Sequence, residues 1–207
     1  EIIAIDNTYY IRVPAELAWV RKVTNEGTED FDGKTISILN DLDMGGYEWE
    51  GIGNSNNPFK GSVEGNNYTI YNIKQENQND PAGIFAVIEV QSHLSISNLK
   101  IDRAEISGNA ACAGILAGQI NLKSGTTLNI SNVNIQGMLN VSGCFSGGGL
   151  AGIIYGQSNA KINIETTNVS GSMTIFYTAE NNSITNTGGF IGYYGNPNGN
   201  IKICDRS

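Results

Sequence analysis

The chain has 207 residues, of which 40% are hydrophobic and only 15% are charged, and its net charge is −8. This much apolar material excludes a disordered chain, and an acidic chain without a basic patch argues against nucleic-acid binding. No apolar run reaches the 18 residues of a membrane-spanning helix, so we expect no membrane insertion. The 26 glycines and the many asparagines favour short strands joined by tight corners.

Residues 1–50 are predicted to form an N-terminal cap with strands and the only helix that the sequence indicates. Pro14 stands at a favourable first helical position, and Gly27 follows the expected end. Apolar residues recur between them with helical spacing: Ala15, Leu17, Ala18, Trp19, Val20 and Val23. We expect a helix over about residues 14–25 that covers one end of a larger β-structure.

Two aspartates of the cap, Asp41 and Asp43, are the candidate metal ligands. Residues two apart on a strand point to the same face, so the two carboxylates are candidates for a Ca²⁺ site or for an acid/base pair. The alternative is that they accept hydrogen bonds from the turn at Gly45-Gly46, which is a common role of aspartate. Apart from this Ca²⁺, the sequence suggests no cofactor.

Residues 51–207 are predicted to be the coils of a β-solenoid, in one domain with the cap, because short runs of small and apolar residues recur. The second residues of successive runs are 31, 35 and 40 positions apart. The runs are Ala82-Gly83-Ile84-Phe85-Ala86, Ala113-Gly114-Ile115-Leu116-Ala117-Gly118, Gly148-Gly149-Leu150-Ala151-Gly152 and Gly188-Gly189-Phe190-Ile191-Gly192. Self-similarity at such a period is typical of stacked repeats.

A second series lies out of phase with the first, and its asparagines are 26, 34 and 36 positions apart. Its members are Ile70-Tyr71-Asn72-Ile73, Ile96-Ser97-Asn98-Leu99, Ile130-Ser131-Asn132-Val133 and Thr167-Asn168-Val169. A weaker third series follows, in Ile106-Ser107-Gly108, Ile135-Gln136-Gly137 and Val169-Ser170-Gly171. We expect the asparagines to stack at corners and the aliphatic residues to stack inside.

Interleaved series with one shared, drifting period predict an all-β fold, a right-handed parallel β-helix. One period fits a coil of three short strands, and coils stack at about 4.8 Å. The polar segments 121–126 and 178–186 are expected to be loops between strands.

The opening segment and the glycine-rich runs together match a known repeat pattern. The residues concerned are Pro14–Val20, Phe31–Ile36, Leu39–Gly46, Trp49–Gly53, Phe59–Ile70, Gly149–Gly152 and Gly189–Gly192. They resemble the GLUG-motif repeat proteins, a family found in surface and secreted proteins of gut Bacteroidetes and in some bacterial surface proteases and adhesins. The resemblance spans about residues 14–195. It implies a β-solenoid, export and a role in adhesion or surface binding, with no shared catalytic residues.

The chain departs from this repeat pattern at Ala86, where the closing glycine is missing, and in its longer last insertion. The first residues lack the basic and apolar regions of a secretion signal, so we expect that any such signal has been removed. Together with the resemblance, this predicts an extracellular or cell-surface location.

Cys112, Cys144 and Cys204 are too few for a disulfide scaffold. Cys112 and Cys144 fall about one coil apart, so a bridge between them stays open. Buried free thiols are the favoured interpretation, because free cysteine packs as a small hydrophobic residue.

No catalytic constellation is evident. The single histidine, His93, has no H-E-x-x-H context, and no G-x-S-x-G occurs. Between residues 106 and 203 the charged residues are only Lys123, Lys161, Glu165, Glu180 and Lys202. We therefore expect no enzyme. A lyase or glycosidase on a β-helix is an alternative that would require a cluster of carboxylates on one face of the solenoid.

Aromatic residues near the insertions are the candidate ligand contacts: Tyr155, Phe176, Tyr177, Tyr193 and Tyr194. Tyrosine rings at a polar surface suit stacking on sugar faces or on a protein partner. Because neighbours on a strand point to opposite faces, only one of Tyr193 and Tyr194 is expected to face outward.

The sequence therefore predicts a non-catalytic, adhesin-like binding module. Its expected partner is an extracellular glycan or a host or bacterial surface protein, within a larger surface assembly or chain. A structural spacer segment of a larger surface protein is the other alternative.

Overall fold

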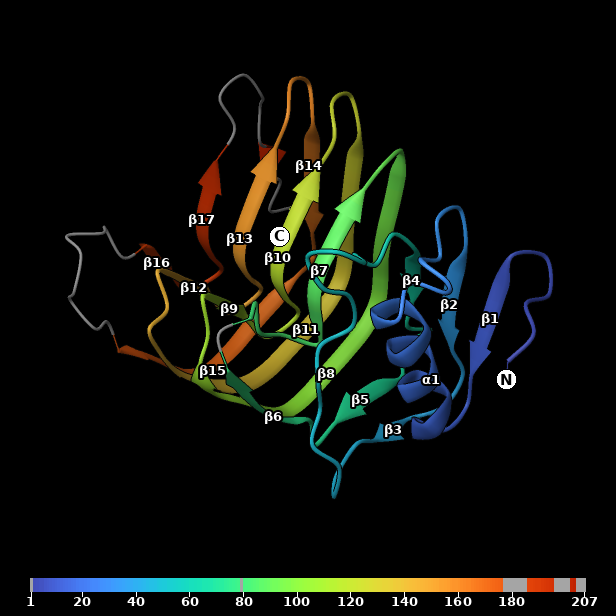
Figure 1. Ribbon diagram of the computed structural model, residues 1–207, viewed down its shortest axis with the longest axis horizontal. Coiled ribbons are helices and arrows are strands. Elements are labelled where there is room, and N and C mark those ends of the chain that lie inside the picture. Colours follow the sequence, from blue (N-terminus) through green and yellow to red (C-terminus); the bar gives the residue numbers. More distant parts are fainter. Residues whose placement is uncertain (1, 79, 177–185, 196–201, 204–207) are drawn as a thin grey trace.

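The computed structural model describes residues 2–78, 80–176, 186–195 and 202–203. It is a parallel β-solenoid of about three turns with one short helix, α1 (Pro14–Asn25). The predicted all-β parallel β-helix with an N-terminal helix is confirmed. In Figure 1 the chain advances from right to left, rising in front along β7, β10 and β13 and descending behind, which makes a right-handed coil.

Three parallel sheets form the walls of the solenoid. Sheet A contains β1 (Thr8–Ile11), β2 (Thr35–Ile38), β3 (Leu42–Asp43), β4 (Ser62–Glu64), β5 (Thr69–Tyr71), β6 (Lys74–Gln78), β8 (His93–Asn109), β11 (Thr127–Ser142), β14 (Lys161–Glu165), β15 (Asn168–Phe176) and β18 (Lys202–Ile203). Sheet B contains β7 (Phe85–Val90), β10 (Ala117–Leu122), β13 (Ala151–Gly156) and β17 (Ile191–Gly195). Sheet C contains β9 (Cys112–Gly114), β12 (Ser146–Gly148) and β16 (Asn186–Gly188).

Inward-facing aliphatic residues stack from coil to coil and form the core. Leu94 of β8 pairs in register with Leu128 of β11, which pairs with Ile162 of β14. All three side chains are buried and belong to one hydrophobic cluster that extends from Tyr9 to Ile164. The alternation of apolar and polar residues on these strands therefore separates an inner from an outer face.

The corner of sheet A depends on residues in the left-handed backbone region. Asn98 and Asn132 have φ of 52° and 51°, and Thr166 follows with 47°. The other two asparagines of the predicted series were misaligned. Asn72 follows Tyr71, which pairs with Asp102, and Asn168 pairs with Asn134. Backbone hydrogen bonds between coils set this register, and similarity between the short Asn-containing motifs does not.

The glycine-rich runs allow sheet C to approach sheet B closely. A Cβ atom on Gly118, Gly152 or Gly192 would lie 2.6–2.7 Å from a backbone nitrogen of the segment packed against it. At Ala86, where the pattern lacks its glycine, Gly51 provides the room, since a Cβ on Gly51 would lie 2.6 Å from that of Ala86. At each of these close contacts one of the two residues must therefore be a glycine, which has no side chain.

The register corrects the predicted alignment of these runs by one residue. Gly114 of β9 pairs with Gly148 of β12, and Gly148 pairs with Gly188 of β16. Gly149 and Gly189, which the spacing had aligned with Gly114, instead follow the strands.

Helix α1 has the predicted bounds and covers the core beside β1. Leu17 and Val20 are buried in the hydrophobic cluster. The side chain of Asn25 donates to the carbonyl of Gly51 at 3.1 Å and accepts from the N–H of Gly53 at 2.7 Å. The end of the helix is thus tied to the next coil.

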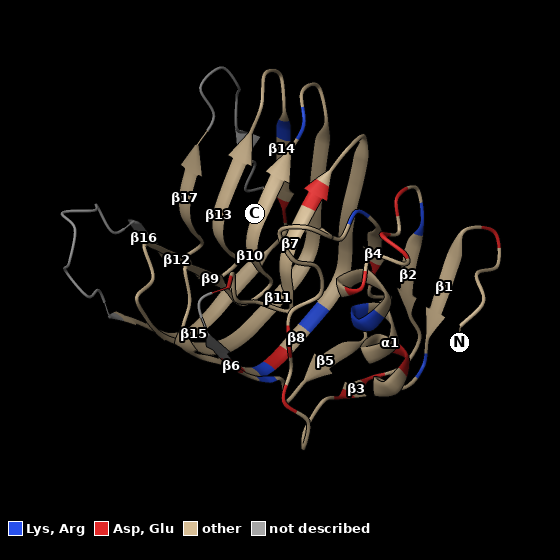
Figure 2. Ribbon diagram, viewed as in Figure 1, with Lys and Arg blue, Asp and Glu red and all other residues tan. Residues whose placement is uncertain are grey.

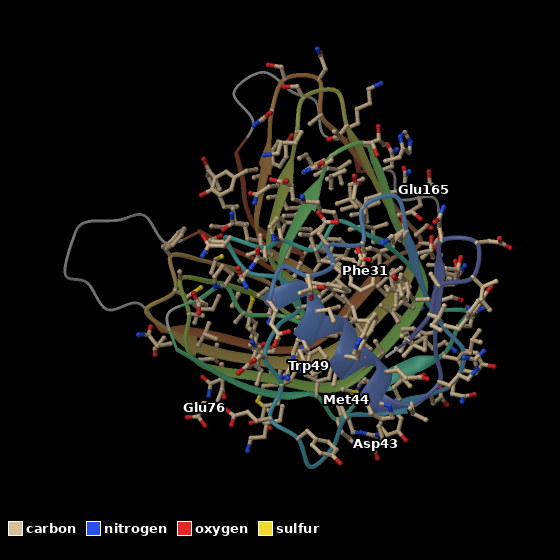
Figure 3. All side chains as sticks on the ribbon, turned by 45° about the vertical axis from the view of Figure 1, so that its right-hand side comes forward. Phe31, Asp43, Met44, Trp49, Glu76 and Glu165 are labelled. Carbon is tan, nitrogen blue, oxygen red and sulfur yellow. The ribbon has the colours of Figure 1, made fainter. Side chains whose placement is uncertain are left out.

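A column of aromatic rings fills the first coils. Phe31 lies inside the body of the protein in Figure 3, with its ring centroid 5.1 Å from Tyr9 and 5.6 Å from Phe59. Phe59 in turn lies 5.0 Å from Phe85. Phe31 has φ of 63°, and its N–H donates to a carboxylate oxygen of Glu29 at 2.9 Å. Such a backbone is unusual for a bulky residue, so Glu29 and the ring contacts hold it in place.

Candidate functional site

Tyr155 and Tyr193 form an aromatic pair on the outer side of sheet B. Tyr155 lies on β13 and Tyr193 on β17, and their ring centroids are 6.2 Å apart at an interplanar angle of 67°. The two side chains are 41% and 39% exposed. Partial burial, followed by the nearby Cys112 and Tyr193, raises the pKa of Tyr155. The Tyr155 hydroxyl therefore stays protonated at neutral pH and can donate a hydrogen bond.

Polar side chains from β7 and β10 extend this pair across the sheet. Asn121 pairs in register with Tyr155 on one side and with Glu89 on the other. The amide of Gln119 donates to Oδ1 of Asn121 at 3.0 Å, and Lys123 forms an ion pair with Glu89 at 2.7 Å. We call this surface the tyrosine face: Glu89, Gln119, Asn121, Lys123, Tyr155 and Tyr193.

The sequence had identified the two tyrosines but not their polar neighbours. Gln119 and Asn121 alternate around the buried Ile120, a pattern that marks outward positions of a strand. Asn121 also precedes Tyr155 by 34 residues, the spacing of one coil. Both signals were present, but only the register connects them.

The other aromatic candidates do not join this face. Tyr194 is partly buried and packs against the core, as expected for the neighbour of an outward Tyr193. Phe176 is the last residue of β15, and its side chain lies outside the described part of the structure. Tyr177 lies outside the described residues.

The structure gives Asp41 and Asp43 hydrogen-bonding partners in their own corner. Both are exposed and flank the buried Leu42, so they share the outer side as predicted. Asp41 accepts from the N–H of Thr69 at 2.7 Å, whereas Asp43 accepts from the N–H of Gly45 at 3.0 Å. The turn-capping alternative therefore describes the observed contact of Asp43.

Asp43 also belongs to a polar network that crosses three coils. Its Oδ1 accepts from the amide of Asn72 at 2.8 Å, and Oδ1 of Asn72 accepts from Nε of Arg103 at 2.8 Å. The N–H of Gly45, the Asn72 amide and the Arg103 charge together lower the pKa of Asp43. A guanidinium this close opposes cation binding, and the described residues contain no cluster of three or more His, Cys, Asp or Glu placed to hold a metal ion.

A groove of about 450 Å³ separates the segment after β3 from the segment after β6. Four acidic residues line it: Glu48, Glu50, Glu76 and Asp80. Glu50 lies 3.7 Å from Nη1 of Arg21, and Glu76 projects away from the protein body in Figure 3. The enzyme alternative would rest on this carboxylate-lined groove.

Charged side chains concentrate on the cap and the first coils, whereas the later coils carry few (Figure 2). The tyrosine face lies mostly on these later coils, with Glu89 and Lys123 as its charged pair. Its outward side chains are therefore mostly aromatic and amide in character.

Both described cysteines, Cys112 and Cys144, are free and buried. Burial, with a smaller contribution from Cys144, raises the pKa of Cys112 to about 12. Buried thiols were the favoured interpretation of the sequence. With such a pKa, Cys112 stays protonated at neutral pH and is a poor nucleophile.

Comparison with known proteins identifies one relative, from Evansella cellulosilytica, named "Putative Gly-rich membrane protein". The two are 33% identical over 115 residues, which is 55% of this chain but 13% of the relative. The chain therefore spans a small part of that protein's length. No family model matches the chain, and no solved structure matches it.

The resemblance to the GLUG-motif proteins accordingly stays a prediction. Within the described parts of the chain, we find no helical segment with the length and hydrophobicity that a membrane crossing requires.

Proposed function

We propose that this chain is a non-catalytic, extracellular or cell-surface binding module that attaches to glycans as an adhesin does. The observation that carries the proposal is the exposed Tyr155–Tyr193 pair beside the amides of Gln119 and Asn121. Rings and amides on one rigid sheet are the combination that carbohydrate recognition uses.

The physical argument rests on what each group offers to a sugar. The faces of a pyranose ring carry C–H groups that pack on aromatic rings, while its hydroxyls require partners that both donate and accept. Carboxamides such as Gln119 and Asn121 do both. Tyr155 and Tyr193 lie on neighbouring strands of a packed sheet, so little conformational entropy is lost when a ligand binds.

The exported location rests on two supports. The first is the resemblance to a family of surface and secreted proteins. The second is the relative that is named a membrane protein, of which the matched region is 13%. Such a fraction suits one module within a longer surface chain.

The test is binding of the purified chain to an array of host and plant glycans, with mucin included. We expect a reproducible hit that Tyr155→Ala and Tyr193→Ala each weaken about tenfold or more, because one stacked ring contributes roughly 1–2 kcal/mol. Tyr47→Ala is the matched control, since Tyr47 is 71% exposed on a loop away from the tyrosine face. A blank array, followed by Tyr155-dependent binding to a host or bacterial surface protein, would replace the glycan with a protein ligand.

A spacer segment of a larger surface protein is the second candidate. The match to a much longer, glycine-rich relative favours it. It predicts no ligand at all, so an array and a receptor screen without any hit would support the spacer.

A carbohydrate-active enzyme is the third candidate, and the four-acid groove favours it. It predicts that the chain releases new reducing ends or unsaturated products from polysaccharides. Glu76→Gln and Asp80→Asn should then abolish the release, whereas Glu165→Gln, at an exposed acid outside the groove, should leave it unchanged. Intact substrates after prolonged incubation would exclude it.

A further inference from the structure

A shallow trough of about 320 Å³ crosses four neighbouring strands of sheet A. The parts of β5, β8, β11 and β15 that line it are at the lower side of Figure 1, away from β13 and β17. Its base contains the buried Ile101 and Ile135. The trough follows the solenoid axis, across the strands, so a ligand within it would meet a new coil about every 4.8 Å.

Two rows of outward polar side chains line this trough. In the first row each coil contributes one residue in register: Thr69, Lys100, Asn134 and Asn168. In the second row Gln136 pairs in register with Ser170, and Asp102 precedes them on β8. The amide of Asn168 donates to Oδ1 of Asn134 at 3.0 Å, which fixes the orientation of both amides.

A β-bulge shapes one edge of the trough. Ile135 pairs with Ile101 but Gly137 pairs with Ala104, so Gln136 faces both Asp102 and Arg103. Cζ of Arg103 lies 5.2 Å from the Tyr71 ring centroid, its Nε donates to Asn72, and its Nη1 lies 3.4 Å from Oδ2 of Asp102. Bulges of this kind redirect a side chain, and here the bulge places the guanidinium beside the row, where it pairs with Asp102.

The two charges that remain in the trough have opposite sign. Lys100 and Asp102 lie on the same strand, and the other polar side chains lining the trough, Thr69, Asn134, Gln136, Asn168 and Ser170, are neutral. Arg103, beside the trough, pairs with Asp102, so the residues that line the trough present no row of like charges to an ionic ligand. The amides and hydroxyls of the trough donate and accept in alternation, as the hydroxyls of a sugar chain do.

We propose that this trough binds a linear, uncharged polysaccharide that lies parallel to the solenoid axis. An extended polypeptide is the less favoured occupant, because peptide grooves gain affinity from apolar pockets for side chains. The outward residues of the trough provide none. The site is separate from the tyrosine face and does not depend on the function proposed for that face.

The test is affinity gel electrophoresis of the full chain in gels that contain konjac glucomannan or mixed-linkage β-glucan. Parallel gels contain polygalacturonate, a charged polysaccharide, or casein, an unfolded polypeptide. We expect an uncharged polysaccharide to retard the chain, and Asn134→Ala to weaken this binding about tenfold, the effect of losing one or two hydrogen bonds to the ligand. Gln136→Ala, which leaves the asparagine ladder intact, should weaken it similarly.

The chain offers a matched control for Asn134. Asn129 of the same strand accepts from the amide of Asn163 at 2.7 Å, so Asn129→Ala removes the same kind of ladder bond outside the trough. Equal melting temperatures of the two variants, with weaker retardation only for Asn134→Ala, would support the proposal. Tyr155→Ala should leave the retardation unchanged, which separates this site from the tyrosine face.

Three results would overturn the proposal. The first is no retardation by either uncharged polysaccharide, and the second is stronger retardation by polygalacturonate or by casein. The third is equal weakening by Asn129→Ala and Asn134→Ala.

Discussion

The amide of Asn132 donates a hydrogen bond to Oδ1 of Asn98, one coil away, across 2.8 Å. Both residues have a left-handed backbone, and the Asn132 amide also reaches Oδ1 of Asn67 at 3.1 Å. The amide hydrogen bonds between coils and the left-handed corner of sheet A thus depend on the same asparagines. Asparagine tolerates this backbone, and its amide can form a hydrogen bond with the next coil.

Asn132→Ala should lower the free energy of unfolding by about 2 kcal/mol, from a lost hydrogen bond and a strained alanine. Asn163→Ala also loses a ladder bond but is not at a left-handed position, so its loss should be about 1 kcal/mol. Urea unfolding of both variants measures the difference. Equal losses would mean that the backbone conformation contributes nothing at this corner.

Gly152→Ala should destabilise the packing of sheet C on sheet B. The new Cβ would lie 2.6 Å from the nitrogen of Ala113 and 2.7 Å from the carbonyl oxygen of Gly118, and backbone on both sides cannot move cheaply. We expect a loss of about 1–3 kcal/mol. Gly189→Ala, with nothing within 4 Å of its Cβ, is the control and should change stability by less than about 0.5 kcal/mol. Similar melting temperatures for the two variants would contradict this account.

Glu29 should make the stability of the cap depend on pH. Burial alone would raise the pKa of Glu29, but hydrogen bonds from Lys34, the Phe31 N–H and Tyr9 lower it below its ordinary 4.5. A lowered folded-state pKa means that this stabilisation is fully present above pH 4.5 and is lost as the pH falls through the folded-state value.

Glu29→Gln should therefore be less stable than the parent at neutral pH, and the gap should close as the pH falls below 4.5. Chemical unfolding across this range measures the gap. Glu26→Gln, which removes an exposed carboxylate at the end of the helix, is the control for the loss of one acidic side chain. A stability gap for Glu29→Gln that widens in acid would show that folding does not lower the pKa of Glu29.

The buried thiols should be protected from alkylation. In a Cys204→Ser variant, Cys112 and Cys144 should react with iodoacetamide at mildly alkaline pH only after unfolding, because both are buried and burial raises both pKa values. Mass spectrometry counts the added groups. Rapid labelling of the native chain would show that sheet C opens readily.

The period of the sequence was enough to predict the coils, but the alignment of one coil on the next was not. Asn72 and Asn98 occur in similar four-residue motifs, Ile-Tyr-Asn-Ile and Ile-Ser-Asn-Leu. They nevertheless occupy different corners, since Tyr71 pairs with Asp102. The bulge at Asp102 and Arg103 adds a residue to one coil, and a spacing count cannot show on which side of a corner an extra residue falls.

The candidate site was predictable only in part. Tyr155 and Tyr193 could be named as outward aromatics, but they are 38 residues apart in the sequence. Their contact at 6.2 Å exists because β17 stacks on β13. The role of Asp43 likewise depended on Asn72 and Arg103, which arrive from later coils.

The sequence by itself determined the fold class, the helix at residues 14–25 and the inward or outward direction of most strand residues. These follow from local periodicity: Pro14 begins a helix, and alternation around Leu94 or Ile120 marks a half-buried strand. The tertiary structure decided which outward side chains become neighbours. Coil stacking places residues about 34 positions apart within 5 Å of each other. The exact partners depend on backbone hydrogen bonds and on bulges, and local composition indicates neither of them.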